Sequence, residues 1–337
     1  MKEEYHYSQY PLNSKRELLV QELAPIADVL VSRKFNPMPF HNSLLQTAAG
    51  VWTPPFTEKE KHIIEKREFV RVAENAEIAL DYSLHRDYSK RPTVVIIPGV
   101  IGSSSSPFSV GIANKAVHYD FNAVRVNLRS AGNTGARSST LYHAGQSEDI
   151  KRVFDELGNI GLTEKLYIAA NSLGGNILLK TIGEMGEEAR RRIGGIALVS
   201  PVVDLEHTGL NMNRIHEYFM LRTFKKKVRE KAKVSPDDWD TSLLKSIKTI
   251  HQWNSAYQTG PEPLRWGFTD VQDYYRKASA LQYVSEVAVP TFIIHAQDDP
   301  VVSALPLGGE QFANNPQIFV MKTLHGGHTG FVNLRRT

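Results

Sequence analysis

The chain has 337 residues, of which 41% are hydrophobic and 23% charged, a composition typical of an ordered globular protein and not of a disordered one. It has no cysteine, which excludes disulfides, thiolate metal sites and a cysteine nucleophile. The N-terminus is polar and acidic and no apolar run approaches the length of a membrane span, so we expect a cytoplasmic protein.

The first part of the chain, residues 1–66, is punctuated by prolines and is expected to wrap the body of the protein. The remainder, residues 67–337, is expected to form one domain that opens with a hairpin around Glu74-Asn75. Apolar runs separated by helical patterns then predict the strands of one sheet: 93–97, 121–128, 165–169, 195–200, 291–295 and 317–322. Strands that alternate with helices predict an α/β fold, with a mostly parallel central sheet and helices on both faces.

The alternation stops after Pro201. Residues 204–287 are helical, aromatic and basic, and we expect them to form a lid over the carboxyl edge of the sheet. The chain has a net charge of +4. Its basic residues concentrate within the lid, in an amphipathic helix predicted over 214–233. A solvated basic face is the favoured interpretation, and weak contact with an anionic membrane surface is the alternative. Nucleic acid is not expected as a partner, because no binding motif accompanies the charge.

A serine stands between a predicted strand and a predicted helix, in the run Ala170-Asn171-Ser172-Leu173-Gly174. A sharp turn there would expose the Ser172 hydroxyl and would require small residues two positions before and after it. Ala170 and Gly174 meet that requirement, although alanine replaces the usual first glycine. Ser172 is therefore the candidate nucleophile.

A serine nucleophile needs a histidine held by an acid. Asp298 and Asp299 follow one predicted strand, and His325 and His328 follow the last, in the chain order Ser, Asp, His that α/β-hydrolases use. The sequence favours Asp298, because an apolar residue follows three positions later, and it favours His328, because glycines flank it.

Backbone amides are also needed to bind the oxyanion. The amide of Leu173, at the start of the helix, and that of Val100, in a glycine-serine loop, are the candidates. This loop lacks the Gly-Lys-Ser/Thr ending of a phosphate-binding loop, so no nucleotide is expected. The histidines show no ligand spacing, so neither a metal nor another cofactor is expected.

The same motifs occur together in one known family. They are Phe35-Asn36-Pro37-Met38, Leu45-Gln46-Thr47, Arg129-Ser130-Ala131-Gly132, Tyr142-His143-Ala144-Gly145, Ser172-Leu173-Gly174-Gly175-Asn176, Asp273-Tyr274-Tyr275-Arg276, His295-Ala296-Gln297-Asp298-Asp299-Pro300 and His325-Gly326-Gly327-His328-Thr329-Gly330-Phe331. With them the chain resembles the YheT-like esterase branch of the α/β-hydrolase superfamily, which is related to ABHD-type lipases and to fungal medium-chain ethyl-ester acyltransferases.

The resemblance implies an α/β-hydrolase fold and assigns the nucleophile, acid and base to Ser172, Asp298 and His328. The family usually has His-Gly where this chain has Pro98-Gly99, and a further helix where this sequence ends at Thr337. Without that helix we expect a looser histidine loop.

The leading hypothesis is a serine hydrolase that cleaves small-molecule acyl esters through an acyl-enzyme intermediate. The alternatives are an acyltransferase that forms esters from an acyl donor and an alcohol, and a non-catalytic scaffold that binds a lipid or a partner. Acyl length, alcohol group and oligomeric state stay open.

Overall fold

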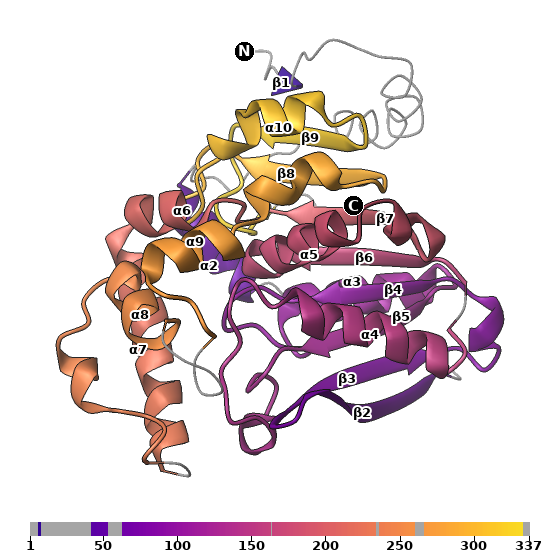
Figure 1. Cartoon of the computed structure of the whole chain (residues 1–337). Coiled ribbons are helices and arrows are strands. Elements are labelled where there is room, and N and C mark those ends of the chain that lie inside the picture. The colour runs from indigo at the N-terminus through magenta and orange to yellow at the C-terminus, as the bar shows by residue number, and fades with distance from the viewer. Residues whose placement is uncertain are drawn as a thin grey trace.

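The computed structural model describes residues 6–7, 42–52, 63–162, 164–233, 236–259 and 266–332. Within them, one sheet has the strand order β1-β9-β8-β7-β6-β4-β5-β3-β2 (Figure 1). The strands are β1 (His6–Tyr7), β2 (Ile64–Ala73), β3 (Ala76–Leu84), β4 (Thr93–Ile97), β5 (Asn122–Asn127), β6 (Leu166–Asn171), β7 (Ile193–Val199), β8 (Thr291–Ala296) and β9 (Ile318–Thr323). From β5 through β4 to β9 neighbouring strands run parallel, and β1, β2 and β3 pair antiparallel at the edges. The predicted hairpin and mostly parallel sheet are confirmed.

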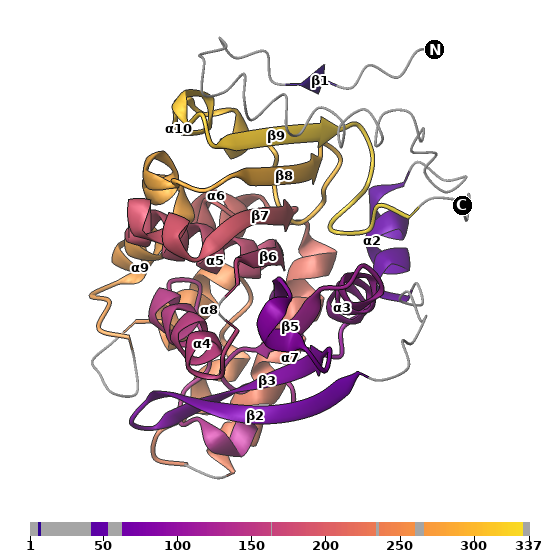
Figure 2. The ribbon, with the colours of Figure 1, turned by 90° about the vertical axis from the view of Figure 1, so that its right-hand side faces the viewer.

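Helices cover both faces of this sheet (Figure 2). The α-helices of the described residues are α2 (Ser43–Trp52), α3 (Pro107–His118), α4 (Ser147–Asn159), α5 (Ser172–Met185), α6 (Leu205–Asn211), α7 (Arg214–Ala232), α8 (Ile250–Tyr257), α9 (Val271–Ala278) and α10 (Glu310–Asn314). Figure 2 shows α3 on one side of the sheet and α4 and α5 on the other. This arrangement puts the carboxyl ends of all the parallel strands at one edge, where ligands bind in such folds.

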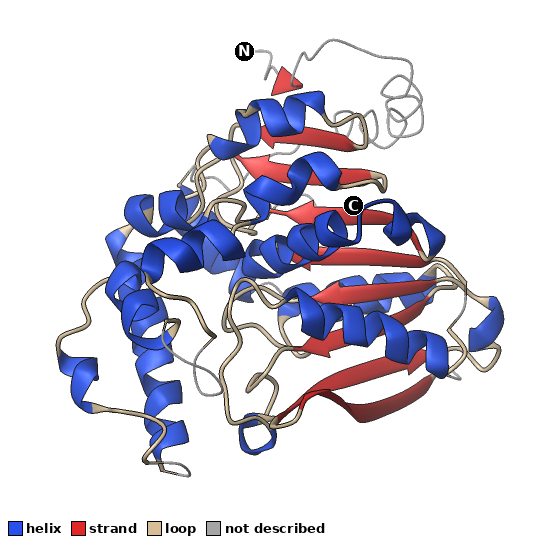
Figure 3. Ribbon diagram, viewed as in Figure 1, coloured by secondary structure: helices blue, strands red, loops and turns tan. Residues whose placement is uncertain are grey.

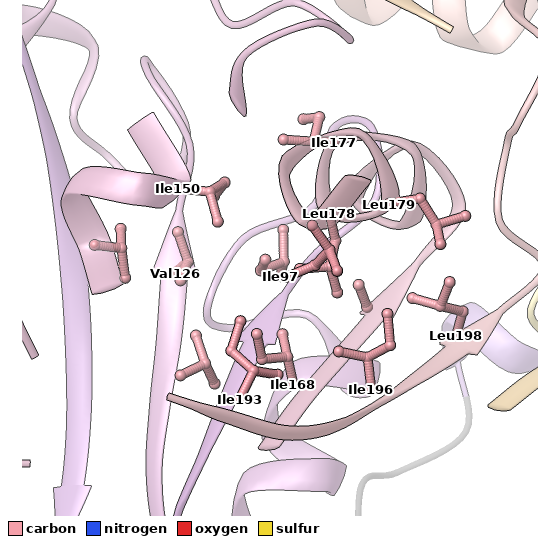
Figure 4. Packing of buried hydrophobic residues seen from close by; sticks show 14 of the residues in the cluster. Ile97, Val126, Ile150, Ile168, Ile177, Leu178, Leu179, Ile193, Ile196 and Leu198 are labelled. Atoms are coloured by element: carbon pink, nitrogen blue, oxygen red, sulfur yellow. The ribbon is translucent and has the colours of Figure 1, made fainter. Parts of the chain in front are cut away.

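Helix α5 packs its apolar residues against the sheet. Leu178 and Leu179 have no exposed surface, and Figure 4 shows them on the side of α5 that faces Ile97, Ile168 and Leu198 of the strands. Burying one such side chain stabilises the fold by about 1.5–3 kcal/mol. The packing therefore fixes the first residues of α5 against the carboxyl ends of β4, β6 and β7.

Residues 204–287 form the inserted segment, which connects the neighbouring parallel strands β7 and β8. Its helices α6 to α9 lie beside the carboxyl ends of the strands, on the left in Figures 1 and 3. Buried aromatic residues of the inserted segment, among them Trp239 and Trp253, form a second apolar cluster together with Leu141. No helix in the described parts of the chain combines the length and the apolar character that crossing a membrane requires.

The predicted basic helix is present as α7, but its basic face is not wholly solvated as expected. Lys225 donates a hydrogen bond to the carbonyl of Ile247 (2.7 Å), and Lys227 donates to that of Ser130 (3.1 Å). Lys231 donates to the carbonyls of residues 135 and 138. Three of the lysines thus attach α7 to other parts of the fold, which corrects the sequence-based interpretation.

The division at residue 66 stays a prediction. Residues 1–5, 8–41 and 53–62 lie outside the described part of the chain, and so do the Phe35-Asn36-Pro37-Met38 motif and the end of the chain at 333–337. Helix α2, which the sequence analysis did not predict, is described, and it lies close to α3.

Candidate active site

Ser172 stands where β6 ends and α5 begins, as the turn pattern predicts. Its backbone has a φ of 51°, a left-handed conformation that costs a non-glycine residue of the order of 1–3 kcal/mol. A Cβ on Gly174 would lie 2.4 Å from the carbonyl oxygen of Pro98, and one on Gly99 would lie 2.9 Å from the Cβ of Ser172. Only glycine fits at these two positions, because the backbone passes too closely.

His328 lies between Ser172 and a carboxylate. Its Nε2 is 2.9 Å from the Ser172 Oγ, and its Nδ1 is 2.8 Å from the Asp299 Oδ2. A carboxylate only accepts hydrogen bonds, so His328 Nδ1 carries a proton and donates a hydrogen bond to Asp299. The unprotonated Nε2 can then accept a hydrogen bond from the serine hydroxyl. The arrangement allows the imidazole to take the serine proton.

The carboxylate beside His328 is therefore Asp299 and not Asp298, which corrects the sequence-based choice. Asp299 Oδ1 accepts the backbone amides of Val301 (2.8 Å) and Val302 (2.9 Å). These two bonds fix the turn after β8 and leave Oδ2 directed at His328. The sequence analysis favoured Asp298 because Val301 follows it by three positions. In the structure Val301 belongs to the turn that Asp299 fixes.

Asp298 holds the histidine loop from another side. Its Oδ1 accepts the amide of Gly327 (2.9 Å), and its Oδ2 accepts from His325 Nδ1 (3.3 Å). The sequence-based preference for His328 over His325 agrees with this geometry, because His325 faces Asp298 and His328 faces Ser172.

Asp299 is ionised in spite of its burial. The side chain has no exposed surface, and burial alone would raise its pKa. The charge of His328, the hydrogen bond from that ring and the charge of His295 outweigh burial and hold the pKa of Asp299 below its ordinary value. A buried anion in this place stabilises a proton on His328.

The loop after β4 is fixed by two side chains to which the sequence analysis assigned no role. The amide of Gly99 donates to Asn171 Oδ1 (2.9 Å), and the amide of Ile101 donates to the Tyr142 hydroxyl (2.6 Å). Burial raises the pKa of Tyr142 to about 12, so this hydroxyl stays neutral. The only sequence signal for Asn171 is that it immediately precedes the serine.

Val100 and Leu173, the expected oxyanion donors, border the cavity that reaches Ser172. Within the described residues no protein acceptor takes the amide hydrogen of either one. Both amides are therefore available to a ligand, and their use as oxyanion donors stays a prediction.

Helix α2 supports the histidine loop, which the sequence did not predict. The Thr47 hydroxyl accepts the amide of His328 (2.8 Å). Gln46 accepts the amide of Val332 (2.9 Å) and donates to its carbonyl (3.2 Å). On the other side, the Ser200 hydroxyl accepts the amide of Thr329 (3.3 Å). These contacts hold the backbone around His328 from two sides.

Among the described residues, two cavities meet at Ser172. The narrow one, of about 90 Å³, runs under the inserted segment and is mostly apolar; we call it the apolar cavity. The wider one, of about 690 Å³, is bounded by the loop after β4, the histidine loop and the start of α7; we call it the open cavity. Val100, Met220 and Val301 border both. A ligand at Ser172 can therefore extend in two directions.

Among the described residues, no group of three or more histidine, aspartate or glutamate side chains is arranged to hold a metal ion.

The chain matches the model of the Hydrolase_4 family, described as serine aminopeptidase, S33, over residues 88–324. The chain belongs to this family. It is also similar to YheT of Escherichia coli (strain K12), which is named an esterase, with 27% identity over 72% of this chain and 71% of that one. The monoacylglycerol lipase of Saccharomyces cerevisiae is 28% identical over 74% of this chain and 57% of the lipase.

Solved structures show the same fold. The Pyrococcus furiosus esterase Pf2001 superposes with a TM-score of 0.52 at 16% identity, over 82% of this chain and 90% of that one. The expected α/β-hydrolase fold and the YheT-like branch are confirmed. The family and its relatives make the chain a hydrolase of the esterase and lipase type.

We expect the stability of the fold to fall in acid because of His143, which lies on the wall of the apolar cavity. Burial, followed by the charges of Arg129 and Lys180, lowers the pKa of His143 to about 3 from 6.5. Because the unfolded chain binds a proton near pH 6.5 and the folded chain does not, stability is lost as the pH falls below 6.5. We expect His143 alone to cost about 2 kcal/mol between pH 7 and pH 5.

Urea unfolding at the two pH values measures this loss. His143→Asn retains an oxygen that can accept the amide of Gly145, the present partner of the ring (3.1 Å), but cannot titrate. The variant should lose distinctly less stability than the wild type on the same pH change. An equal loss in both proteins would show that His143 is not responsible.

Proposed function

We propose that this protein hydrolyses carboxylic acyl esters through a covalent acyl-enzyme. The observation that carries the proposal is the pair of hydrogen bonds joining Ser172 to His328 and His328 to Asp299. The substrate class follows from the relatives named as an esterase and a lipase, together with the apolar cavity beside the serine.

In this mechanism the Ser172 oxygen attacks the ester carbonyl carbon while His328 Nε2 takes the hydroxyl proton. Asp299 stabilises the imidazolium that forms. The oxyanion of the tetrahedral intermediate accepts hydrogen bonds from the amides of Val100 and Leu173. His328 then gives its proton to the leaving alcohol oxygen, the C–O bond breaks, and the acyl group stays on Ser172. Water, activated by His328, releases the acid.

The two cavities divide the substrate. The apolar cavity is lined by Leu205, Met212 and Trp253, among others, and its surface favours the acyl chain. The open cavity then receives the alcohol part and admits water. Hydrolysis needs a cavity that both releases the alcohol and admits water, because the alcohol must leave before water attacks.

The decisive experiment is labelling with a fluorophosphonate probe, which reacts with an activated serine. The wild type should be labelled, and Ser172→Ala should not be. Hydrolysis of nitrophenyl esters should fall about 10⁴-fold or more in that variant. A folded wild type that takes no label would instead favour the non-catalytic scaffold, and undiminished labelling of Ser172→Ala would contradict the assignment of the serine.

Acyl transfer is the second candidate, supported by the size of the open cavity beside Ser172. An alcohol could enter it and attack the acyl-enzyme in place of water, using the same residues. The ratio of ester to acid formed from one acyl donor, with and without added ethanol, distinguishes transfer from hydrolysis.

We further propose weak membrane contact through α7. The support for membrane contact is that Arg222, Lys226 and Arg229 stay exposed on α7, as do Tyr218 and Phe219. Cosedimentation with anionic and neutral vesicles tests the contact, since only the anionic vesicles should bind.

A further inference from the structure

A charged side chain that the mechanism above does not use borders the apolar cavity. Met220, Phe224 and Lys227 of α7 all line this cavity, and their spacing places them on one face of the helix. Met220 also borders the open cavity beside Ser172, whereas Phe224 and Lys227 do not. Since a helix rises about 1.5 Å per residue, Lys227 stands about 10 Å further along α7 than Met220 does. It therefore marks the end of the apolar cavity that is remote from Ser172.

Lys227 is half-buried and has no carboxylate partner. Its Nζ donates to the carbonyl of Ser130 (3.1 Å), and among the described residues no acid forms an ion pair with it. Glu230, three residues later, pairs instead with Lys226 (3.8 Å). An ammonium group has three hydrogen atoms to donate, and a charge that is removed from water is favourable only when it is paired. A ligand that carries a negative charge could supply the missing partner.

Two further observations place polar groups at this end of the cavity. The Lys227 Nζ lies 5.6 Å from the centre of the Tyr142 ring, which borders the same cavity. Asn254 of α8 and Gln258, directly after α8, also border the apolar cavity and not the open one. Their amide groups can donate hydrogen bonds to the same anion. The remote end of the cavity is therefore polar, and its charge is positive.

The size of the cavity limits the ligand. A volume of about 90 Å³ holds roughly six to nine atoms of the size of a water molecule, at about 10–15 Å³ each. An acyl chain of that size, with its carbonyl carbon at Ser172, extends toward Lys227. A carboxylate at the end of the chain would pair with the ammonium, whereas a terminal methyl group would leave it unpaired.

Burial lowers the pKa of Lys227 more than the charge of Glu230 raises it. A carboxylate bound beside the ammonium would raise this pKa again, because it favours the charged form. Ligand and lysine would thus each stabilise the charge of the other.

We propose that the remote end of the apolar cavity binds a carboxylate through Lys227, so that the preferred acyl groups are those of dicarboxylic acids. The middle of the acyl chain then makes apolar contacts, and its end forms an ion pair. The inference depends on the proposed function, since it names the acyl class for the same serine.

The test compares two nitrophenyl esters of nearly the same length, the half ester of adipic acid and the ester of heptanoic acid. Only the first ends in a carboxylate. The wild type should cleave the adipate half ester with a kcat/KM at least as high as that for the heptanoate ester. Lys227→Met retains the aliphatic stem without the charge. It should lower the ratio of the two kcat/KM values, adipate to heptanoate, about tenfold or more, because the carboxylate then loses its water without gaining a partner.

Two further variants make the result specific. Lys227→Gln keeps a donor for the Ser130 carbonyl but no charge, so it should lower the ratio as well, also where the methionine variant fails to fold. Lys225→Met removes another lysine of α7, which donates to the carbonyl of Ile247 (2.7 Å) and does not border the apolar cavity. Its ratio should stay within about twofold of the wild type, because salt screens a charge that does not touch the ligand.

Several outcomes would overturn the inference. They are a wild type that cleaves the adipate half ester distinctly more slowly than the heptanoate ester, a ratio that is unchanged in the Lys227 variants, and an equal fall of the ratio in Lys225→Met. In each of them the heptanoate ester is still cleaved, so the proposed hydrolysis stands. A wild type that takes the fluorophosphonate label but cleaves neither ester also overturns the acyl class. One that cleaves neither ester and takes no label contradicts the proposed function itself.

Discussion

Asp299→Asn should lower kcat about 10⁴-fold, while the same substitution at the adjacent Asp298 should lower it less than about tenfold. The two residues are neighbours of the same type, so one pair of substitutions compares two hydrogen-bond environments. Asp299 contacts His328, and Asp298 contacts His325 and the amide of Gly327.

The large effect at Asp299 comes from the proton on the histidine. In Asp299→Asn the oxygen can still accept the amides of Val301 and Val302, so the turn is expected to persist. The new NH₂ group then faces His328 Nδ1 and can only donate to it. That forces the proton to Nε2, where it blocks the acceptance of the Ser172 proton.

The small effect at Asp298 follows from the same reasoning. The oxygen of an asparagine can still accept the Gly327 amide, and only the bond to His325 is weakened. Initial rates on a nitrophenyl ester, with thermal melting as the check on folding, compare the variants. A 10⁴-fold loss in Asp298→Asn with a mild loss in Asp299→Asn would restore the sequence-based assignment.

Asp298 and Asp299 also show which parts of the site can be predicted from the sequence. Ser172 and His328 could be found because a strained turn and a close backbone need small neighbours, and glycines mark such places. The sequence favoured Asp298 over Asp299 wrongly, since the choice depends on which carboxylate accepts the amides of Val301 and Val302 in the turn after β8. A single position decides it, and the sequence pattern fits both.

Contacts between residues far apart in the chain could not be predicted from the sequence, for a different reason. Thr47 and Gln46 support a loop that lies about 280 residues further along the chain, and no local periodicity carries that information. The lysines of α7 are a similar case. Apolar residues at helical spacing between them correctly predicted an amphipathic helix. Lys227 and Lys231, however, donate to carbonyls of a distant loop, which only the packed structure brings near.

The largest change in stability is expected from a substitution at the start of that loop, at Arg129. Arg129 forms a bidentate ion pair with Asp149, at 2.8 and 2.7 Å, and also donates to Thr140 (3.1 Å). The two charged side chains are only 8% and 1% exposed. Arg129→Met should lower the free energy of unfolding by about 3–5 kcal/mol at neutral pH, because it leaves a buried carboxylate without a partner.

The pH dependence separates this cause from a simple loss of packing. Burial already raises the pKa of Asp149, against the opposing effect of Arg129, so removing the arginine should raise it further. A carboxyl whose folded pKa lies above its unfolded value loses stability as the pH rises through the folded value. The difference between wild type and Arg129→Met should therefore be larger at pH 7.5 than at pH 4.5 in urea unfolding.

Two controls complete the argument. Adding Asp149→Asn to Arg129→Met removes the uncompensated charge, so the double variant should be more stable than the single one at neutral pH. Arg91→Met breaks exposed ion pairs with Asp87 and Asp120 and should matter far less. A loss in Arg129→Met that is the same at both pH values would assign it to packing. The charge-based loss would instead show that a buried ion pair anchors the loop that carries Tyr142, and through Tyr142 the backbone expected to bind the oxyanion.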